Sequence, residues 1–141
     1  MTEPDNGLST DDATALAEEI VAVVADLENV TLDYSVDSLN HVDRVIGGFH
    51  EEGVPIDEVE ATIFRFGCYV GEVFVRNAGA AWRVATQDEL ENIFGVPLVI
   101  DLPDGSTANP IGKALKRLQN GEEDNLPYFY EVFTQPQSKS S

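Results

Sequence analysis

The chain has 141 residues, 43% of them hydrophobic, so it is long enough for one domain with its own core. Its 26 acidic residues outnumber 8 basic ones, and the net charge of −18 disfavours binding to nucleic acid or to anionic membrane surfaces. One cysteine and two histidines are too few for a thiolate or imidazole metal cluster, so we predict no metal site and no cofactor.

The N-terminal segment, residues 1–9, is acidic and polar. It lacks a basic stretch followed by an apolar one, so we do not expect it to be a signal peptide. No apolar run in the chain approaches the roughly 20 residues needed to cross a bilayer. We therefore expect a flexible tail over residues 1–9 and a soluble cytoplasmic protein.

Two amphipathic helices are predicted before residue 54. The first follows Ser9 or Thr10 as its N-cap and runs to about residue 30. The second covers residues 35–53, where Gly47 and Gly48 predict either a close packing partner or a break. The inward residues expected in the first helix are Leu16, Ile20, Val23, Leu27 and Val30, and in the second Leu39, Val42, Val45, Ile46 and Phe49.

The third helix, predicted over residues 55–77, is apolar around more than half of its circumference, which indicates the central helix of the domain. Asp57 and Glu60 have the spacing of a capping box. Gly67 and Gly71 lie four residues apart and would allow another element to approach the helix backbone closely. One narrow polar stripe is left, formed by Glu58, Arg65, Tyr69, Glu72 and Arg76.

The pattern changes after Trp82, where short β-strands replace long helices. A strand over residues 81–85 and an acidic helical turn over 86–95 are expected first. A strand, an Asp104-Gly105 turn and a return strand over 97–109 follow. Two further helices are predicted, over 109–121 with Asn109 as its cap and over 123–133 with Asp124 or Asn125 as its cap.

These elements predict an α+β fold, with one mostly helical domain over residues 10–133. A central buried helix and a small antiparallel sheet before the C-terminal helices are its main features. Residues 134–141 are polar and are expected to form a second flexible tail.

Three segments resemble, in order, a widespread family of small uncharacterised bacterial proteins: "LDYSVDSLNHVDRVI", "GCYVGEVFVRNAGAAW" and "NPIGKALKRLQNGEEDNLPYFY". The resemblance covers roughly residues 32 to 130. One departure is "AGAAW", where the family pattern has a second glycine beside Gly79. The resemblance implies a bacterial, intracellular α+β domain and does not imply an activity.

Glu72 is the sharpest candidate for chemistry, because a carboxylate among apolar residues can act as an acid or a base. The simpler interpretation is a helix ion pair with Arg76, four residues on, with Arg65 on the same stripe. Tyr69 is interpreted as a packed ring whose hydroxyl reaches water. Cys68, in the same apolar helix, is interpreted as a small buried thiol.

Lys113 and Trp82 complete the candidate residues. Lys113 lies in the first turn of a helix, where a cation is slightly unfavourable, so it is expected to contact a carboxylate such as Glu72 or an anionic ligand. Trp82 is interpreted as a core anchor between helix and sheet, with pocket lining as the alternative. His41 and His50 lie on opposite faces of one helix and cannot act together.

Two function classes stay open. The first is a non-catalytic interaction module, in a specific form an acidic immunity-type inhibitor of a basic protein. The second is a small-molecule binder or enzyme whose polar site comprises Arg65, Glu72, Arg76 and Lys113, with Trp82 as the pocket floor. The acidity has two explanations as well, a basic partner or adaptation to a salt-rich cytoplasm, and the sequence leaves the oligomeric state open.

Overall fold

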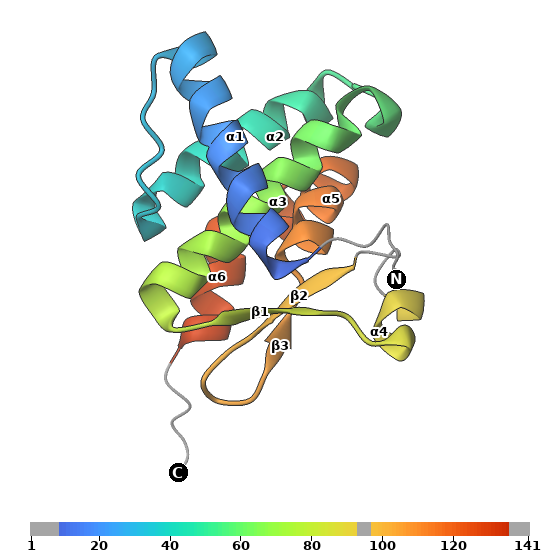
Figure 1. Cartoon of the computed structure of the whole chain (residues 1–141). Helices are drawn as coiled ribbons and strands as arrows, with labels where there is room; N and C mark the ends of the chain where they lie inside the picture. The colour runs from blue at the N-terminus through green and yellow to red at the C-terminus, as the bar shows by residue number, and fades with distance from the viewer. Residues whose placement is uncertain (1–8, 93–96, 136–141) are drawn as a thin grey trace, which may run out of the picture.

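Helices make up most of the fold, and the chain forms a three-stranded antiparallel sheet after the third long helix and before the C-terminal helices (Figure 1). This computed structural model describes residues 9–92 and 97–135. The predicted α+β class and the position of the sheet are confirmed. The elements are α1 (Thr10–Glu28), the 3-10 turn η1 (Val36–Ser38), α2 (Leu39–Glu51), α3 (Ile56–Ala78), β1 (Ala81–Val84), α4 (Gln87–Asn92), β2 (Leu98–Asp101), β3 (Thr107–Ala108), α5 (Pro110–Asn120), the 3-10 turn η2 (Gly121–Asp124) and α6 (Leu126–Thr134).

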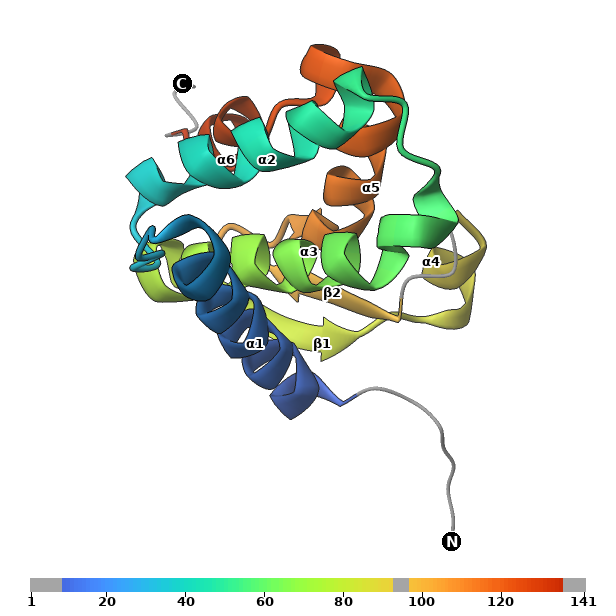
Figure 2. The same cartoon turned by 90° about the horizontal axis from the view of Figure 1, so that it is seen from above.

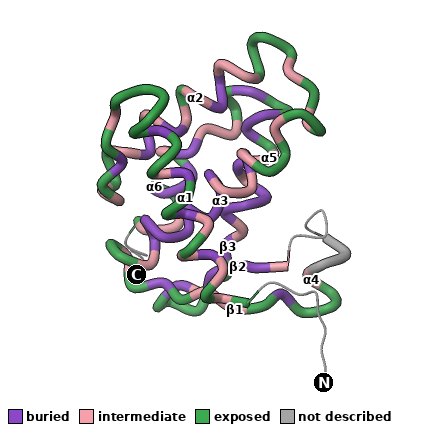
Figure 3. The backbone as a smooth tube through the Cα atoms, turned by 45° about the horizontal axis from the view of Figure 1, so that its top comes forward, coloured by how far each residue is buried: buried purple, intermediate pink, exposed green. Residues whose placement is uncertain are grey.

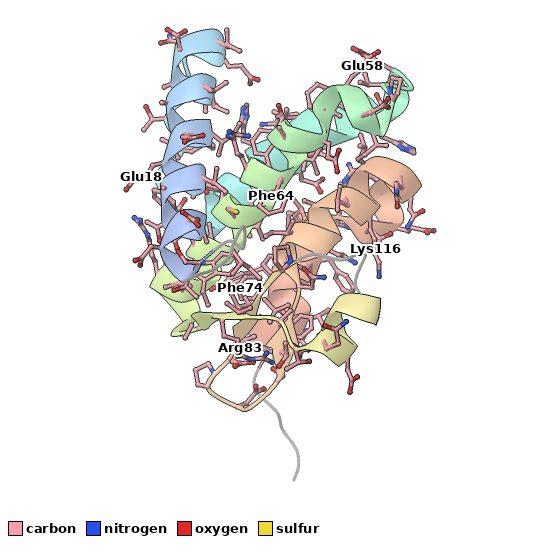
Figure 4. All side chains as sticks on the ribbon, turned by 45° about the vertical axis from the view of Figure 1, so that its right-hand side comes forward. Glu18, Glu58, Phe64, Phe74, Arg83 and Lys116 are labelled. Carbon is pink, nitrogen blue, oxygen red and sulfur yellow. The ribbon has the colours of Figure 1, made fainter. Side chains whose placement is uncertain are left out.

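The helix α3 is central, as its wide apolar surface predicts. Seen from above, it lies between the sheet on one side and α2 and α6 on the other (Figure 2). It packs most extensively against α1 and α5. Its middle is buried from Phe66 to Phe74 without interruption. Purple, buried backbone gathers around α3 at the centre of the molecule in Figure 3. Phe74 points into the interior, where its ring packs against Phe129 and Tyr130 of α6 (Figure 4).

Two glycines of α3 mark the close approaches that their spacing predicts. A Cβ atom at Gly67 would lie 2.5 Å from the Cα of Ile111, so the backbone of α5 rests directly on this helix. A Cβ atom at Gly71 would collide with the ring of Trp82. Cys68 lies between them, fully buried, and burial raises the pKa of its thiol to about 12. The interpretation of Cys68 as a small buried thiol is therefore confirmed.

The inward face of α1 differs from the prediction. Val23 and Leu27 are 43% and 75% exposed, although both were expected in the core. Alanines, and not the larger residues, form the contact with α3, because their small side chains let the two helices approach closely. The C-terminal end of α1 also projects past its neighbours (Figure 1). The buried residues of α1 are Ala13, Ala17, Ile20 and Val24.

The starts of α2 and α3 also differ from the sequence prediction. The chain forms a 3-10 turn over Val36–Ser38 before α2 begins at Leu39. Pro55 is the N-cap of α3, so the predicted capping box of Asp57 and Glu60 is wrong. Asp57 lies instead in the first turn, where the helix dipole favours a carboxylate.

The sheet and the C-terminal helices follow the prediction closely. Strand β2 is central and pairs antiparallel with β1 and β3, and Gly105 has a positive φ of 92° in the turn that connects β2 to β3. Asn109 caps α5 by accepting a hydrogen bond from Gly112 N, and Asn125 caps α6 by accepting one from Tyr128 N.

Parts of three predicted segments lie outside the described residues: most of the tail over 1–9, the end of the helical turn over 86–95, and most of the tail over 134–141. Thr134, the first residue of that second tail, is the last residue of α6. Within residues 9–92 and 97–135, the helices are too short or too polar to traverse a bilayer.

Candidate functional site

Glu72 is buried in α3, with 4% of its surface exposed, and its carboxylate is fully engaged. Oε1 accepts a hydrogen bond from Arg76 Nε at 3.2 Å. Oε2 accepts one from Trp82 Nε1 at 2.9 Å and one from Thr14 Oγ1 at 3.0 Å. The predicted ion pair with Arg76 is thus confirmed, and partners from α1 and β1 complete the shell. Glu72 joins three elements of the fold.

Arg76 continues this cluster outward and lies over an aromatic ring. Its guanidinium carbon is 3.6 Å from the centroid of Tyr34, a cation–π contact. Tyr34 in turn stacks on Tyr69, with ring centroids 4.8 Å apart. We call Thr14, Tyr34, Glu72, Arg76 and Trp82 the Glu72 cluster.

Tyr34 has a positive φ of 65°, a backbone conformation that favours glycine. Two hydrogen bonds hold it there: its backbone N donates to Tyr69 Oη at 2.8 Å, and its carbonyl accepts from Asn77 Nδ2 at 2.8 Å. The segment between α1 and η1 is therefore fixed against α3.

Tyr69 corrects the prediction that its hydroxyl reaches water. The residue is fully buried, and its Oη lies 2.7 Å from Ser38 Oγ in addition to its bond with Tyr34 N. Burial raises the pKa of this hydroxyl. The polar stripe of α3 faces α1 and the preceding loop at this point, and it does not face solvent.

The remaining candidates have partners of their own. Arg65 Nε donates to Glu19 on α1 at 2.8 Å. Lys113 Nζ donates to Asp124 in η2 at 2.6 Å, which lowers the pKa of that carboxyl. Lys113 therefore does have the carboxylate contact that its position predicted, but the carboxylate is Asp124 in place of Glu72. The structure does not bring Arg65, Lys113 and Glu72 to one site.

Trp82 has the role of an anchor between helix and sheet. Its ring covers Gly71 and its indole N–H is committed to Glu72, while the side chain is half-buried. This geometry matches the interpretation as a core anchor. The two histidines are likewise separate, since His41 bonds to Glu28 and His50 to the carbonyl of Leu118.

A second charged pair, between Asp43 and Arg117, has no counterpart among the sequence predictions. Arg117 is 4% exposed, and its Nε and Nη2 donate to the Asp43 carboxylate at 2.8 and 3.2 Å. Asp43 Oδ1 also accepts from Leu126 N at 2.9 Å. One carboxylate thereby connects α2, α5 and the start of α6.

A weak sequence signal for this pair exists. Arg117 lies three positions after the inward residue Ala114, at the edge of the apolar face of α5. Because a charge at such a position is partly buried, it needs a partner of opposite charge. The fit depends on Gly47, because a Cβ atom at that position would lie 2.6 Å from Arg117 Nη2. The close packing partner expected for the Gly47-Gly48 pair is therefore the Arg117 guanidinium, which packs against Gly47.

Neither cluster has the arrangement of a metal site. In the part of the chain that the structure describes, no group of three His, Cys, Asp or Glu side chains is placed to hold a metal ion. Comparisons of the chain with family models, with curated proteins and with solved structures found no match.

Proposed function

We propose that this chain is a non-catalytic binding module that recognises a basic protein, in the manner of an acidic immunity-type inhibitor. The distribution of charge carries the proposal. Arg65, Arg76, Arg83, Lys113 and Arg117 each form an ion pair with a carboxylate of the same chain. With only 8 basic residues against 26 acidic ones, the fold's own ion pairs use most of its cations and leave a strongly acidic surface.

Five acidic residues lie close together in the sequence where α2 ends and α3 begins. We call Glu51, Glu52, Asp57, Glu58 and Glu60 the acidic corner; all five are exposed. Within residues 9–92 and 97–135, none of these carboxylates has an ion-pair partner. Glu58 points away from the body of the molecule (Figure 4). A concentrated field of one sign accelerates the encounter with a partner of opposite sign.

The alternative of an enzyme or small-molecule site built from Arg65, Glu72, Arg76 and Lys113 draws no support from this geometry. Arg65 and Lys113 are each occupied by a different carboxylate. Glu72 accepts three hydrogen bonds from side chains of the same chain, so its carboxylate connects elements of the fold.

The test begins with affinity capture from the native cytoplasm and identification by mass spectrometry. Association rates of the captured basic protein are then measured at several salt concentrations. The test variant carries Glu52→Gln, Asp57→Asn, Glu58→Gln and Glu60→Gln. The matched control carries Asp11→Asn, Glu18→Gln, Asp26→Asn and Glu131→Gln, which neutralise the same number of exposed acids elsewhere; Glu18 and Glu58 lie far apart in Figure 4.

We expect the test variant to associate about tenfold more slowly at low salt, with a flatter salt dependence, and the control to change much less. Equal rates for the wild type and both variants would refute recognition through the acidic corner. A captured set without any basic protein would assign the acidity to solubility or to a salt-rich cytoplasm.

We also infer membership of the bacterial family that the three quoted segments resemble, and with it a cytoplasmic location. Contacts between the segments support this inference. Ser38 and Asp43 of the first segment meet Tyr69 of the second and Arg117 of the third. The residues that carry the resemblance thus include those that tie the helices together, which fits a family that shares a fold.

A further inference from the structure

A polar pocket of about 450 Å³ lies between α2, α5 and η2, away from the Glu72 cluster. Its volume falls within the range of small-molecule sites, about 300–1,000 Å³. Its wall on α2 includes Arg44, Gly48 and Glu51, and Arg117 and Glu122 close the opposite side. We call this cavity the Arg117 pocket.

Arg117 supplies the pocket with a fixed hydrogen-bond donor. Asp43 holds Nε and Nη2, and the backbone of Gly47 lies against the guanidinium plane. Nη1 donates to no acceptor in the described part of the chain. Among the described residues, the Tyr34 hydroxyl is the buried side-chain polar atom that lacks a partner, so Nη1 is not fully enclosed. Arg117 belongs to the lining of the pocket. A guanidinium held rigidly with one nitrogen open is prepared to bind an oxyanion.

The rim of the pocket carries both signs of charge. Arg44 is exposed on one side, and Glu51 and Glu122 are exposed as well. Asp43 neutralises Arg117. The remaining charged groups of the lining are the Glu51 and Glu122 carboxylates and Arg44, whose Nη2 also lies 3.4 Å from His41 Nδ1. A purely anionic ligand would be repelled by Glu51 and Glu122, while a purely cationic one would leave Nη1 without an acceptor.

We propose that the Arg117 pocket binds a small zwitterion that carries a carboxylate and an ammonium group, of the class of polar α-amino acids. The ligand carboxylate accepts from Arg117 Nη1 and faces Arg44. The ligand ammonium donates to Glu51 and Glu122. This site goes beyond recognition of a basic protein, because its ligand is of a different class and, apart from Glu51, its residues lie outside the acidic corner.

Gly48 allows the pocket to be filled without harming the fold. It lies on α2 and lines the pocket, and a Cβ atom at this position would meet nothing within 4 Å. Gly48→Leu therefore places a side chain in the cavity and also replaces a poor helix former. Ala25→Leu, on an exposed position of α1, is the matched control.

The experiment is calorimetric titration of the full-length chain with L-glutamine as the zwitterion, and with acetate, ethylammonium and inorganic phosphate as single-charge probes. We expect saturable binding of L-glutamine with a dissociation constant of about 1 mM or tighter. Arg44→Gln and Glu122→Gln should each weaken it about tenfold, because each removes one charge-assisted contact at an exposed position. Gly48→Leu should abolish binding, and Ala25→Leu should retain it.

Three results would overturn the proposal: no saturable heat with L-glutamine, binding of acetate, ethylammonium or phosphate as tight as that of L-glutamine, or undiminished binding by Gly48→Leu. A thermal unfolding curve for each variant confirms that the fold is intact. The acidic-corner test variant leaves Arg44, Glu51, Arg117 and Glu122 unchanged. Failure of the pocket and failure of basic-protein recognition are therefore separately observable.

Discussion

Single charged residues connect the elements of this protein. Glu72 binds Thr14, Arg76 and Trp82, and Asp43 binds Arg117 and the backbone of Leu126. Burying a carboxylate costs free energy because its hydration is lost. Several hydrogen bonds from protein donors to the same carboxylate offset that cost. Losing such a carboxylate leaves several donors without an acceptor.

Glu72→Gln should therefore lower the free energy of unfolding by about 1–3 kcal/mol, because the charge that faces Arg76 is lost while the side-chain shape is kept. Urea denaturation measures the change. Glu60→Gln, on an exposed position of the same helix, is the control and should stay within about 0.5 kcal/mol of the wild type. Full stability of Glu72→Gln would contradict a structural role for the carboxylate.

At the scale of elements, α3 organises the fold through its glycines and its two main neighbours, α1 and α5. Gly67 and Gly48 form an informative pair for this reason. Both lie inside helices, but a Cβ atom would strike the backbone of Ile111 at Gly67 and would meet open space at Gly48.

Gly67→Ala should destabilise the protein by about 1–3 kcal/mol, because the backbone of α5 must move away. Gly48→Ala should instead stabilise it by up to about 1 kcal/mol, the ordinary gain of alanine over glycine in a helix. Urea midpoints of the two variants decide the point. Equal shifts in the same direction would mean that α5 does not rest on α3 as described.

Arg83 on β1 forms ion pairs with α4 and β2, and its contribution to the stability of the fold depends on pH. It donates to Glu89 of α4 at 2.8 Å and to Asp101 of β2 at 2.7 Å (Figure 4 labels Arg83). Its hydrogen bonds lower the pKa of Glu89 from 4.5 to about 2 and also lower the pKa of Asp101. A depressed pKa gives stability that is present above 4.5 and lost as the pH falls toward 2.

The advantage of the wild type over Arg83→Met should therefore be constant near neutral pH and shrink as the pH falls from 4.5 toward 2. Urea midpoints of both proteins across this pH range test the expectation. A difference between the two that does not change with pH would show that Arg83 acts through packing alone.

Most helices and strands could be predicted from local patterns, because helix periodicity and caps such as Asn109 and Asn125 depend on residues close in sequence. The ion pair of Glu72 with Arg76 is also local. Partners supplied by tertiary packing could not be predicted: no spacing rule relates Asp43 to Arg117, which are 74 residues apart. The buried face of α1 differs from its prediction because close packing against α3 favours small alanines, whereas helical periodicity ranks a larger residue such as Leu27 as inward.

At the scale of the whole molecule, a net charge of −18 on 141 residues means that the surface repels itself. The ion pairs of Arg65, Arg76, Arg83, Lys113 and Arg117 lie between or within elements of the fold, so the exposed acids keep most of their charge uncompensated. Mobile cations in the solvent must screen this charge.

The melting temperature should therefore rise as sodium chloride increases from about 0.01 M to about 1 M, where the Debye length falls from about 30 Å to about 3 Å. The acidic-corner test variant should start higher than the wild type at low salt and converge with it at high salt. Calorimetric scans of both proteins provide the measurement. A melting temperature that is independent of salt would indicate that repulsion among the acids contributes little.

The Asp43 carboxylate also has a consequence for synthesis on the ribosome. Helices α1 and α3 can pair as soon as both have left the exit tunnel, because both precede α5 and α6 in the chain. Asp43, by contrast, has to wait for Arg117 and Leu126, which are synthesised 74 and 83 residues later. Until then the face of α3 that receives α5 stays uncovered. The nascent chain is therefore vulnerable to misassociation in the interval between the synthesis of α3 and that of α5.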